Sequence, residues 1–311
     1  MKIAFLNKYQ DKVSRGAETF VSELYERLSK DNQVDVISKV NYFDLLKNKY
    51  DVVIPTNGRL QVFLVRIVTW LTHSKMIVSG QSGIGWDDKL NLLSFPNTFV
   101  ALSEKASKWA KKFNPSIKVV QIPNGVDLNK FTVQGQSLRV DLKKPIVLAV
   151  GAFTPQKRMD LAIRAVAKLP EVSLLMLGGG GELENELKLL GSKMLGNRFQ
   201  IMSVPFAQMP EVYRCASVFT LPSASSESFG NVLVEAMASG LPVVATDDPV
   251  RREIVGDAGL FVDPTDTEGY AVAIKKALDT DWGTKPRSQA EKFSWDEIAK
   301  KYNDLFSKLT K

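Results

Sequence analysis

The sequence predicts an α/β protein with two doubly wound domains, each a parallel sheet covered by helices on both faces. Short apolar segments alternate with amphipathic segments of helical period along the whole chain. The alternation restarts after a polar, turn-rich stretch at residues 134–137, which suits a linker. The length of 311 residues also fits two domains, since one domain usually has about 100 to 200 residues.

The first half of the chain contains six apolar segments of strand length and three longer segments of helical period. In the first helical segment Phe20, Val21, Leu24 and Leu28 recur at helical spacing. The predicted strands are residues 3–6, 34–37, 52–54, 76–78, 98–102 and 118–122, and the predicted helices are residues 19–28, 60–71 and 104–113.

The second half repeats the same pattern and ends in an additional helix. Its predicted strands are residues 146–150, 172–177, 199–203, 218–221, 243–245 and 260–262. Its predicted helices are residues 159–169 and 183–190, with further helices that begin near Pro210, Gly230, Pro249 and Glu268. The pattern therefore places the first domain at residues 1–135 and the second at residues 143–285.

The last segment predicts a helix with its own start signal. Ser294 and Glu297 form a capping-box pattern, in which each side chain can accept from a first-turn backbone N–H group. Ile298, Tyr302 and Leu305 then begin one apolar stripe that continues to Leu309. This helix must pack against another part of the chain.

The positive charge lies in the first half. The net charge is +7, and residues 1–135 hold 19 Lys and Arg against 12 Asp and Glu, whereas the remainder holds 22 of each. A basic half indicates an anionic partner, namely a phosphorylated substrate, a membrane surface or a nucleic acid, although an ordinary lysine-rich surface is an equal alternative. No nucleic-acid motif is present, and aromatic residues do not alternate with the basic ones.

The composition also excludes several kinds of site. One cysteine, Cys215, excludes an internal disulfide and a cysteine-based zinc site, and one histidine, His73, excludes a multi-histidine metal centre. The longest apolar stretch, residues 60–71, carries Arg66 and is too short to span a bilayer. Because no signal peptide pattern is present either, we expect a cytosolic protein that does not cross a membrane, and peripheral contact with one stays open.

The turn after the strand at residues 218–221 carries the richest set of polar residues. Ligands of parallel α/β sheets bind beyond the carboxyl ends of the strands, where loops lead into helices. The helix beginning near Gly230 offers its positive end to an anion, with Glu227 in the preceding loop. Asn231 and Glu235 are four residues apart and share a helix face. This arrangement suits a ligand with both phosphate and hydroxyl groups; the alternative is a solvated loop before an ordinary helix.

Three other turns add candidate residues. After the strand at 146–150, Gly151 is followed by Lys157 and Arg158, which can reach a phosphate from just before a helix. Gly16, after the first strand, lets the backbone approach a ligand closely. The four glycines at 178–181 lack the register of a dinucleotide-binding loop, so we expect a tight turn that lines the site.

The stretch at residues 79–88 resembles a flexible substrate loop, with three glycines followed by Trp86, Asp87 and Asp88. An acceptor could stack on Trp86 and bond to one of the aspartates, while a plain surface loop is the competing interpretation. Residues 279–281 read Asp-Thr-Asp, but they follow a predicted helix near the C-terminus and are interpreted as a loop. The sequence thus predicts no metal site.

These turns, in this order, resemble the retaining glycosyltransferases of family 4, also called group 1 glycosyltransferases, which have the GT-B fold. Residues 227–235, Glu-Ser-Phe-Gly-Asn-Val-Leu-Val-Glu, look like the E-x7-E signature of that family, and they continue into Ala-Ser-Gly-Leu-Pro-Val-Val-Ala-Thr at 238–246. The matching segments are residues 2–28, 120–131, 147–165, 174–187 and 204–264, and those of the first half match more loosely. The resemblance implies two Rossmann-like domains that face a central cleft.

The resemblance implies roles for single residues of the second, nucleotide-sugar-binding domain. Glu235 would bind the ribose hydroxyls of the donor, Glu227 would face the donor sugar, and Lys157 would neutralise the diphosphate. The backbone around the helix start would donate N–H groups to sugar and diphosphate. The residues involved there are Phe229, Gly230, Asn231 and Val232, and Gly151 and Arg158 complete the expected donor site.

The same resemblance assigns the first domain to the acceptor side. Gly16 would lie beneath the donor phosphates, Gln81, Trp86 and Asp87 would lie near the acceptor, and the helix at residues 294–311 would return to this domain. Two positions depart from the family pattern. Ala152 stands where an arginine is usual, and Gln81 is nearest to where a histidine is common.

The implied activity is retaining, metal-independent transfer of a sugar from a nucleotide-diphosphate sugar, with no cofactor. The acceptor is an unidentified glycan, lipid-linked molecule or small molecule. The resemblance also points to cell-envelope or polysaccharide biosynthesis, in the cytoplasm or at the inner face of the cell membrane. Because of Ala152 and Gln81, a nucleotide-sugar-binding partner protein with little catalysis is the alternative.

Overall fold

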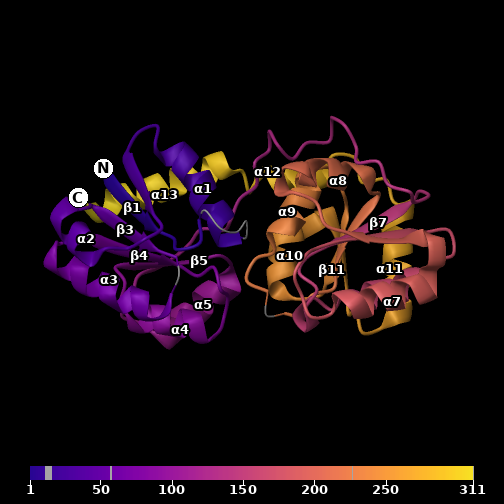
Figure 1. Cartoon of the computed structure of the whole chain (residues 1–311), viewed down its shortest axis with the longest axis horizontal. Helices are drawn as coiled ribbons and strands as arrows, with labels where there is room; N and C mark the ends of the chain where they lie inside the picture. Colours follow the sequence, from indigo (N-terminus) through magenta and orange to yellow (C-terminus); the bar gives the residue numbers. More distant parts are fainter. Residues whose placement is uncertain (11–15, 57, 226, 311) are drawn as a thin grey trace. The chain divides into compact units, whose positions relative to one another are not determined.

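A six-stranded parallel sheet with helices on both faces forms each of two units (Figure 1). The computed structural model describes residues 1–10, 16–56, 58–225 and 227–310. Unit 1 comprises Met1–Gly125 together with Trp295–Lys311, and unit 2 comprises Val126–Ser294. The predicted α/β class with two doubly wound domains is therefore confirmed.

Unit 1 has the strand order β2-β1-β3-β4-β5-β6, and all neighbouring strands run parallel. Each strand overlaps its predicted segment, because buried parallel strands appear in a sequence as short runs of apolar residues. The strands are β1 (Lys2–Leu6), β2 (Gln33–Ile37), β3 (Val52–Pro55), β4 (Lys75–Ser79), β5 (Thr98–Ala101) and β6 (Val119–Gln121). The helices are α1 (Gly16–Leu28), α2 (Tyr42–Asn48), α3 (Arg59–Leu71), α4 (Trp86–Leu93), α5 (Glu104–Phe113) and the terminal α13 (Trp295–Thr310).

Unit 2 has the strand order β12-β11-β10-β7-β8-β9, again parallel throughout. The strands are β7 (Ile146–Val150), β8 (Ser173–Leu177), β9 (Phe199–Met202), β10 (Val218–Leu221), β11 (Val243–Thr246) and β12 (Gly259–Val262). The helices are α6 (Met159–Ala167), α7 (Glu184–Leu195), α8 (Met209–Cys215), α9 (Asn231–Ala238), α10 (Pro249–Val255), α11 (Thr267–Asp279) and α12 (Lys285–Glu291). Single 3₁₀ turns are η1 (Pro155–Lys157), η2 (Gly196–Arg198), η3 (Phe206–Gln208) and η4 (Gly256–Ala258).

Helix α13 joins the core of unit 1, as expected. Trp295, Ile298, Tyr302 and Phe306 are buried in one apolar cluster with Phe20 of α1, and the Tyr302 and Phe20 rings are 5.7 Å apart. The apolar stripe read from the sequence therefore faces the sheet. Next to the helix start the Ser294 backbone N–H donates to Glu291 O, and Glu297 accepts from Lys300.

The boundaries of the units differ from the predicted ones at both ends of unit 2. The segment after Gly125 already packs on unit 2, where the Phe131 ring lies 5.8 Å from that of Tyr213 and Leu138 N donates to Glu211 O. At the other end, α12 packs against α9, and Arg287 donates to the backbone oxygens of Phe131 and Ala238. The polar stretch at 134–137 thus lies within unit 2 and is not the boundary.

Three short helices were not predicted, namely α2, α4 and α12. Each has seven or eight residues, too few for a clear helical period. Among the described residues, none of the helices has the length and apolarity needed to cross a membrane.

Candidate active site

The candidate site lies at the carboxyl ends of β7 and β10, the point where the strand order of unit 2 reverses. From β7 the chain proceeds outward through β8 and β9, then returns to place β10 on the other side of β7. The loops after β7 and β10 diverge at such a switch point and leave a crevice for ligands. One backbone contact joins the two loops, since Ala224 N donates to Gln156 O at 2.8 Å.

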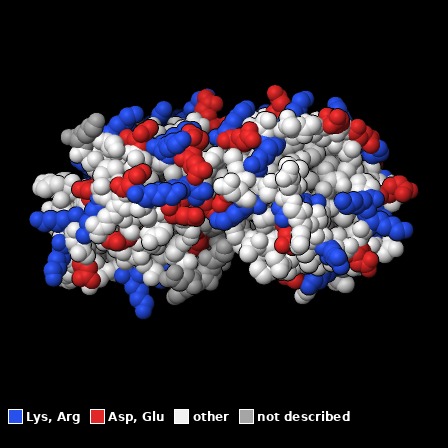
Figure 2. Space-filling model, turned by 90° about the horizontal axis from the view of Figure 1, so that it is seen from above, with Lys and Arg blue, Asp and Glu red and all other residues white. Residues whose placement is uncertain are grey.

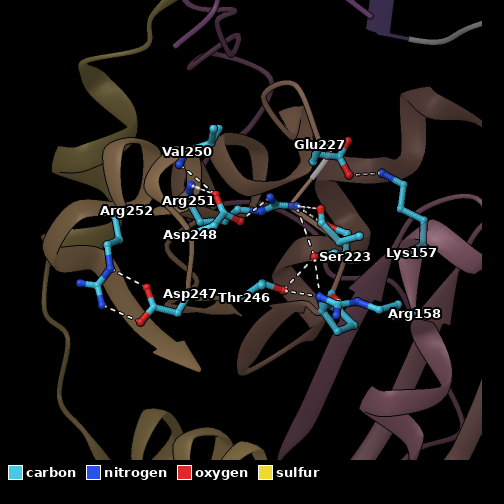
Figure 3. A network of polar contacts seen from close by, with 12 residues as sticks. Lys157, Arg158, Ser223, Glu227, Thr246, Asp247, Asp248, Val250, Arg251 and Arg252 are labelled. Atoms are coloured by element: carbon cyan, nitrogen blue, oxygen red, sulfur yellow. Dashed lines mark hydrogen bonds and ion pairs between the residues drawn. The ribbon is translucent and has the colours of Figure 1, made fainter. Parts of the chain in front are cut away.

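Lys157 and Glu227 meet across these two loops (Figure 3). Lys157 ends the 3₁₀ turn η1, and its Nζ donates to Glu227 Oε2 at 2.5 Å. The two side chains are 22% and 19% exposed, so the ion pair is mostly buried but a ligand can still reach it. The structure thus brings together the cation and the carboxylate that the sequence placed 70 residues apart.

The backbone at the start of α9 is shaped by Gly230. Its φ of +89° lies in the left-handed region that glycine adopts without strain, and it is the N-cap of the helix. Asn231 and Val232 form the first turn, where helical N–H groups and the dipole favour an anion. The Phe229 ring is buried 5.8 Å from that of Phe293, so only the Phe229 backbone can serve a ligand.

Glu235 lies one turn further along α9 and is buried. Its Oε2 accepts from the hydroxyl of Tyr213, on α8, at 2.8 Å. Burial, followed by the negative charge of Glu235, raises the pKa of Tyr213 well above its usual value of 10.0. The tyrosine therefore remains a hydrogen-bond donor at any physiological pH and fixes the Glu235 carboxylate.

Arg158 follows Lys157 directly but is directed into the sheet edge (Figure 3). Its φ is +48°, and its guanidinium donates to Pro222 O at 2.8 Å, Ser223 O at 3.0 Å and Thr246 Oγ1 at 3.2 Å. The Thr246 hydroxyl in turn donates to Ser223 O. Arg158 thus holds the start of the loop after β10, a role that the sequence did not reveal.

A second arginine, Arg251 on α10, holds the same loop from the other side (Figure 3). It is fully buried, with Nη1 at 2.5 Å from Asp248 Oδ2. Its Nη2 donates to Ser223 Oγ at 2.5 Å and to Ala224 O at 3.0 Å. Asp248 also caps α10 by accepting from the backbone N–H groups of Val250 and Arg251. The loop that carries Glu227 is therefore clamped by two cations at its base.

The glycine-rich turn after β8 forms the floor beside this site. A Cβ on Gly178 would lie 2.1 Å from Gly151 O, and one on Gly181 would lie 2.3 Å from Phe153 O. Only glycine permits this backbone approach. Gly151 lies beneath the Lys157 side chain, because a Cβ there would be 3.5 Å from Lys157 Cδ.

The remaining predicted residues belong to unit 1. Gly16 is the exposed first residue of α1, and Arg15 before it lies outside the described residues, as does Ser226 of unit 2. Gln81 exchanges two hydrogen bonds with Asn124, at 2.9 and 3.0 Å.

The prediction that residues 79–88 form one flexible loop is wrong for its last three residues. Trp86 begins α4, with its side chain exposed, and Asp87 lies in the first turn. Asp88 is buried and accepts from Asn91 Nδ2 at 3.0 Å. The acidic residues suit the positive end of the helix, which explains why this glycine-rich stretch ends in regular structure.

Two residues that contact the candidate site, Tyr213 and Arg251, were not predicted from the sequence. Tyr213 looks like one more apolar residue of a short helix, and only the tertiary fold brings it to Glu235. The sequence did contain a signal for Arg251. Asp248 precedes Pro249 at a helix start, and an arginine three residues after Asp248 can form an ion pair with its carboxylate. Among the described residues, no group of three or more His, Cys, Asp or Glu side chains is placed to hold a metal ion.

The family described as "Glycosyl transferases group 1" matches residues 131–296, which include every unit 2 residue of the candidate site. The chain belongs to the group 1 glycosyltransferases. The resemblance seen in the sequence is thereby confirmed.

Relatives of this glycosyltransferase include a phosphatidyl-myo-inositol mannosyltransferase of Mycolicibacterium smegmatis, 32% identical over 212 residues, which are 64% of this chain and 54% of that protein. A D-inositol 3-phosphate glycosyltransferase of the same organism is 36% identical over 189 residues, 55% of this chain and 43% of that protein. A lipopolysaccharide core biosynthesis glycosyltransferase, LpsE of Rhizobium meliloti, is 35% identical over 160 residues, 49% of this chain and 46% of that protein. The chain spans about half the length of these relatives or less.

Solved structures share the fold over nearly the whole chain. HepE of Anabaena, in complex with UDP and glucose, superimposes with a TM-score of 0.80 at 17% identity, covering 99% of this chain and 100% of that one. Sucrose-phosphate synthase of Thermosynechococcus elongatus gives a TM-score of 0.78 at 20% identity, covering 99% and 98%. At these identities the likeness establishes the GT-B fold of this group 1 glycosyltransferase.

Proposed function

We propose that the chain transfers a glycosyl group from a nucleotide-diphosphate sugar to an acceptor, with retention at the anomeric carbon and without a metal ion. The observation that carries this proposal is the position of Lys157, Glu227 and the amino end of α9 at one switch point. A cation beside a helix N-terminus suits a diphosphate, and a neighbouring carboxylate suits sugar hydroxyls.

Each group then has a role in donor binding. The ammonium of Lys157 and the first-turn N–H groups of α9 would bind the diphosphate, and Glu227 would accept from hydroxyls of the sugar. Glu235, held by Tyr213, would accept from the ribose hydroxyls. We leave Arg158 out of donor binding because its guanidinium already donates to Pro222 O, Ser223 O and Thr246 Oγ1.

The chemical step needs stabilisation of a departing diphosphate. As the bond between the anomeric carbon and the phosphate oxygen breaks, negative charge grows on that oxygen, where Lys157 and the α9 dipole stabilise it. The acceptor oxygen bonds to the anomeric carbon on the same face, and its proton passes to the leaving diphosphate. Neither a metal ion nor a covalent glycosyl-enzyme intermediate enters this route.

The names of the relatives support an acceptor of the cell envelope. One is named for phosphatidyl-myo-inositol, which is a lipid, and one for lipopolysaccharide core biosynthesis. We therefore propose a cytoplasmic enzyme of cell-envelope or polysaccharide biosynthesis that contacts the membrane peripherally through unit 1. In this scheme Gln81, Trp86 and Asp87 of unit 1 would contact the acceptor.

A panel of nucleotide sugars tests the proposal. We expect one class of donor to raise the melting temperature and to be hydrolysed slowly without acceptor, equally well in EDTA. Glu235→Ala should abolish the melting shift. No shift with any nucleotide sugar would refute the proposal, and hydrolysis that EDTA stops would refute its metal independence.

A second function is favoured by Ala152 and by the Gln81–Asn124 pair. Ala152 offers no cation to the diphosphate, and the Gln81 amide is engaged by Asn124. A protein that binds nucleotide sugar and transfers nothing would show the melting shift with one class of nucleotide sugar, yet neither hydrolysis of that sugar nor transfer to any acceptor in a cell extract.

A further inference from the structure

Helix α3 of unit 1 is apolar on its outer face as well as on its inner face. Val62, Val65 and Val68 are buried in the core beneath it. On the opposite side Leu60, Ile67, Trp70 and Leu71 are each between 55% and 76% exposed. A helix on the surface of a domain normally turns polar residues to solvent, and one that is apolar all round is normally covered. We call these four residues the α3 face.

The helices beside α3 extend this face. Both α2 and α4 pack against α3, and all three lie along one side of the unit 1 sheet (Figure 1). Phe43 of α2 is 81% exposed, and Leu93 and Phe95, at the end of α4, are about half exposed. Helices α3 and α4 run antiparallel to the strands that follow them, so both helices end where those strands begin. The exposed apolar residues Trp70, Leu71, Leu93 and Phe95 therefore lie at the same end of the sheet.

The charge of unit 1 indicates which kind of partner the α3 face can bind. Unit 1 holds 22 Lys and Arg against 14 Asp and Glu, whereas unit 2 holds 19 against 20. No Asp or Glu occurs between residues 52 and 86, the stretch that contains α3, and exposed Lys47 and Lys49 stand at the end of α2. On the face shown in Figure 2, by contrast, basic and acidic side chains of unit 1 are mixed.

We propose that the α3 face inserts into the interface of an anionic lipid bilayer. Leucine, isoleucine and tryptophan side chains enter the boundary between headgroups and acyl chains, and nearby lysines are attracted to anionic headgroups. A second copy of the chain is the less suitable occupant, because two units with an excess of eight positive charges would repel one another at a symmetric contact.

Helix α5, with four lysines around Trp109, offers a weaker surface. The Trp109 ring stacks on Phe113 at 5.7 Å and packs against the unit 1 core, and Lys108 is paired with Glu104 at 2.7 Å. The apolar side chain needed for insertion is thus engaged within the protein, in contrast to Trp70. Binding through the α3 face would hold the chain at the membrane that contains a lipid-linked acceptor, and this link to glycosyl transfer rests on the proposed function.

Vesicle flotation with the full chain tests the insertion. The probes are vesicles of phosphatidylcholine alone and of phosphatidylcholine mixed with phosphatidylglycerol, at low and at high salt. We expect binding to the anionic vesicles, a blue shift of tryptophan fluorescence, and weaker binding at high salt. Ile67→Glu and Trp70→Glu should each lower the partition coefficient about tenfold or more, because each places a carboxylate in the inserted face.

Matched controls come from exposed apolar residues of unit 2. Leu189 and Val272 are 74% and 67% exposed, and Leu189→Glu and Val272→Glu should leave vesicle binding unchanged. Equal binding of Trp70→Glu and wild type would overturn the proposal. So would a wild-type dimer in buffer that Trp70→Glu converts to monomer, since the face would then bind a second copy.

The donor reaction separates this proposal from the proposed function. The α3 variants should hydrolyse nucleotide sugar in the absence of vesicles at the wild-type rate. Lys157→Ala should float with anionic vesicles as the wild type does but lose hydrolysis. If neither the wild type nor any variant hydrolyses a nucleotide sugar, the proposed glycosyl transfer is refuted. If the wild type hydrolyses the donor but does not float with anionic vesicles, only the proposed insertion of the α3 face is refuted.

Discussion

The ammonium of Lys157 lies 2.5 Å from Glu227 Oε2, so the cation assigned to the diphosphate and the carboxylate assigned to the sugar neutralise one another. In the proposed function, a diphosphate arriving at Lys157 would compete with Glu227 for the ammonium. The released carboxylate would then accept from sugar hydroxyls, and this exchange would couple recognition of the two parts of the donor. A sugar without the matching hydroxyl would leave the carboxylate unpartnered at a cost of about 1–3 kcal/mol or more.

Lys157→Ala should lower kcat/KM for donor hydrolysis about 100- to 1000-fold, because it removes positive charge at the leaving diphosphate. Lys168→Ala is the control, since Lys168 forms an ion pair with Glu268 at a more exposed place of the same unit and should leave the rate unchanged. The rates of Lys157→Ala, Glu227→Gln and the double variant form a mutant cycle. Strictly additive losses would contradict the coupling described above.

The hydrogen bond from Tyr213 to Glu235 predicts an effect on donor affinity at a distance from the ligand. Tyr213→Phe keeps the ring but removes the hydroxyl, so the buried Glu235 carboxylate loses a donor. The free energy of unfolding should fall by about 1–3 kcal/mol, since the carboxylate is left less well satisfied. The donor Kd, measured by calorimetry, should rise in the same direction as for Glu235→Gln, whereas kcat at saturating donor changes little.

A lower kcat with unchanged donor affinity in Tyr213→Phe would contradict the prediction that Tyr213 supports donor binding through Glu235. Tyr25→Phe is a suitable control, because Tyr25 is exposed and lies on α1 of unit 1. We expect that variant to match the wild type in both stability and donor affinity.

The sheets could be predicted from the sequence because buried parallel strands leave short apolar runs between turns, as at 146–150 and 218–221. The helix that begins after Gly230 was equally visible, since a glycine in that position marks a turn into an apolar helix. Helix α4 was hidden by the glycines before it, which indicate a loop although Trp86 begins a regular helix.

The parts of the site that could not be predicted depend on long-range contacts. Arg158 appeared to be a phosphate ligand because it follows Lys157, but carbonyl groups 64 and 65 residues away capture its guanidinium. Local pattern reveals the residue types and the turn in which they occur. It does not reveal which of two adjacent cations is available to a ligand, because that depends on acceptors after β10 and in β11.

Two neighbouring arginines of α10 should differ sharply in their effect on stability. Arg251 is fully buried and paired with Asp248, so Arg251→Ala leaves a buried carboxylate without its cation and should cost about 3–5 kcal/mol. Arg252 pairs with Asp247 at the surface, where both partners are about half exposed, and Arg252→Ala should leave the free energy of unfolding close to the wild-type value. Urea denaturation of both variants measures the difference.

Activity of the Arg251 variants separates folding from positioning. Arg251→Lys keeps the charge but loses the second arm that binds Ser223 Oγ and Ala224 O, and Glu227 follows in that loop. We expect a folded protein whose kcat falls while donor affinity through Glu235 is retained. If Arg251→Lys kept full kcat, the clamp on the loop would serve stability alone.

Asp88 predicts a dependence of stability on pH. Burial, opposed by a hydrogen bond from Asn91 and assisted by the charge of Asp87, raises the pKa of Asp88 from 3.8 to about 7. Below pH 3.8 the carboxyl is protonated in both folded and unfolded chains. Between pH 3.8 and about 7 the Asp88 carboxyl is protonated in the folded chain but ionised in the unfolded chain. The stability that the folded chain gains by holding this proton is therefore lost as the pH rises through this range.

Since one pKa unit corresponds to about 1.4 kcal/mol, the loss has an upper limit of about 4 kcal/mol. Asp88→Asn keeps an oxygen for Asn91 and carries no charge, so its free energy of unfolding should vary less between about pH 5 and about pH 8 and exceed that of the wild type at the higher pH. The control is Glu26→Gln, which removes an exposed carboxylate of α1, and its stability should follow the wild-type profile. Parallel pH profiles for wild type and Asp88→Asn in urea denaturation would show that the Asp88 carboxylate is ionised throughout this range.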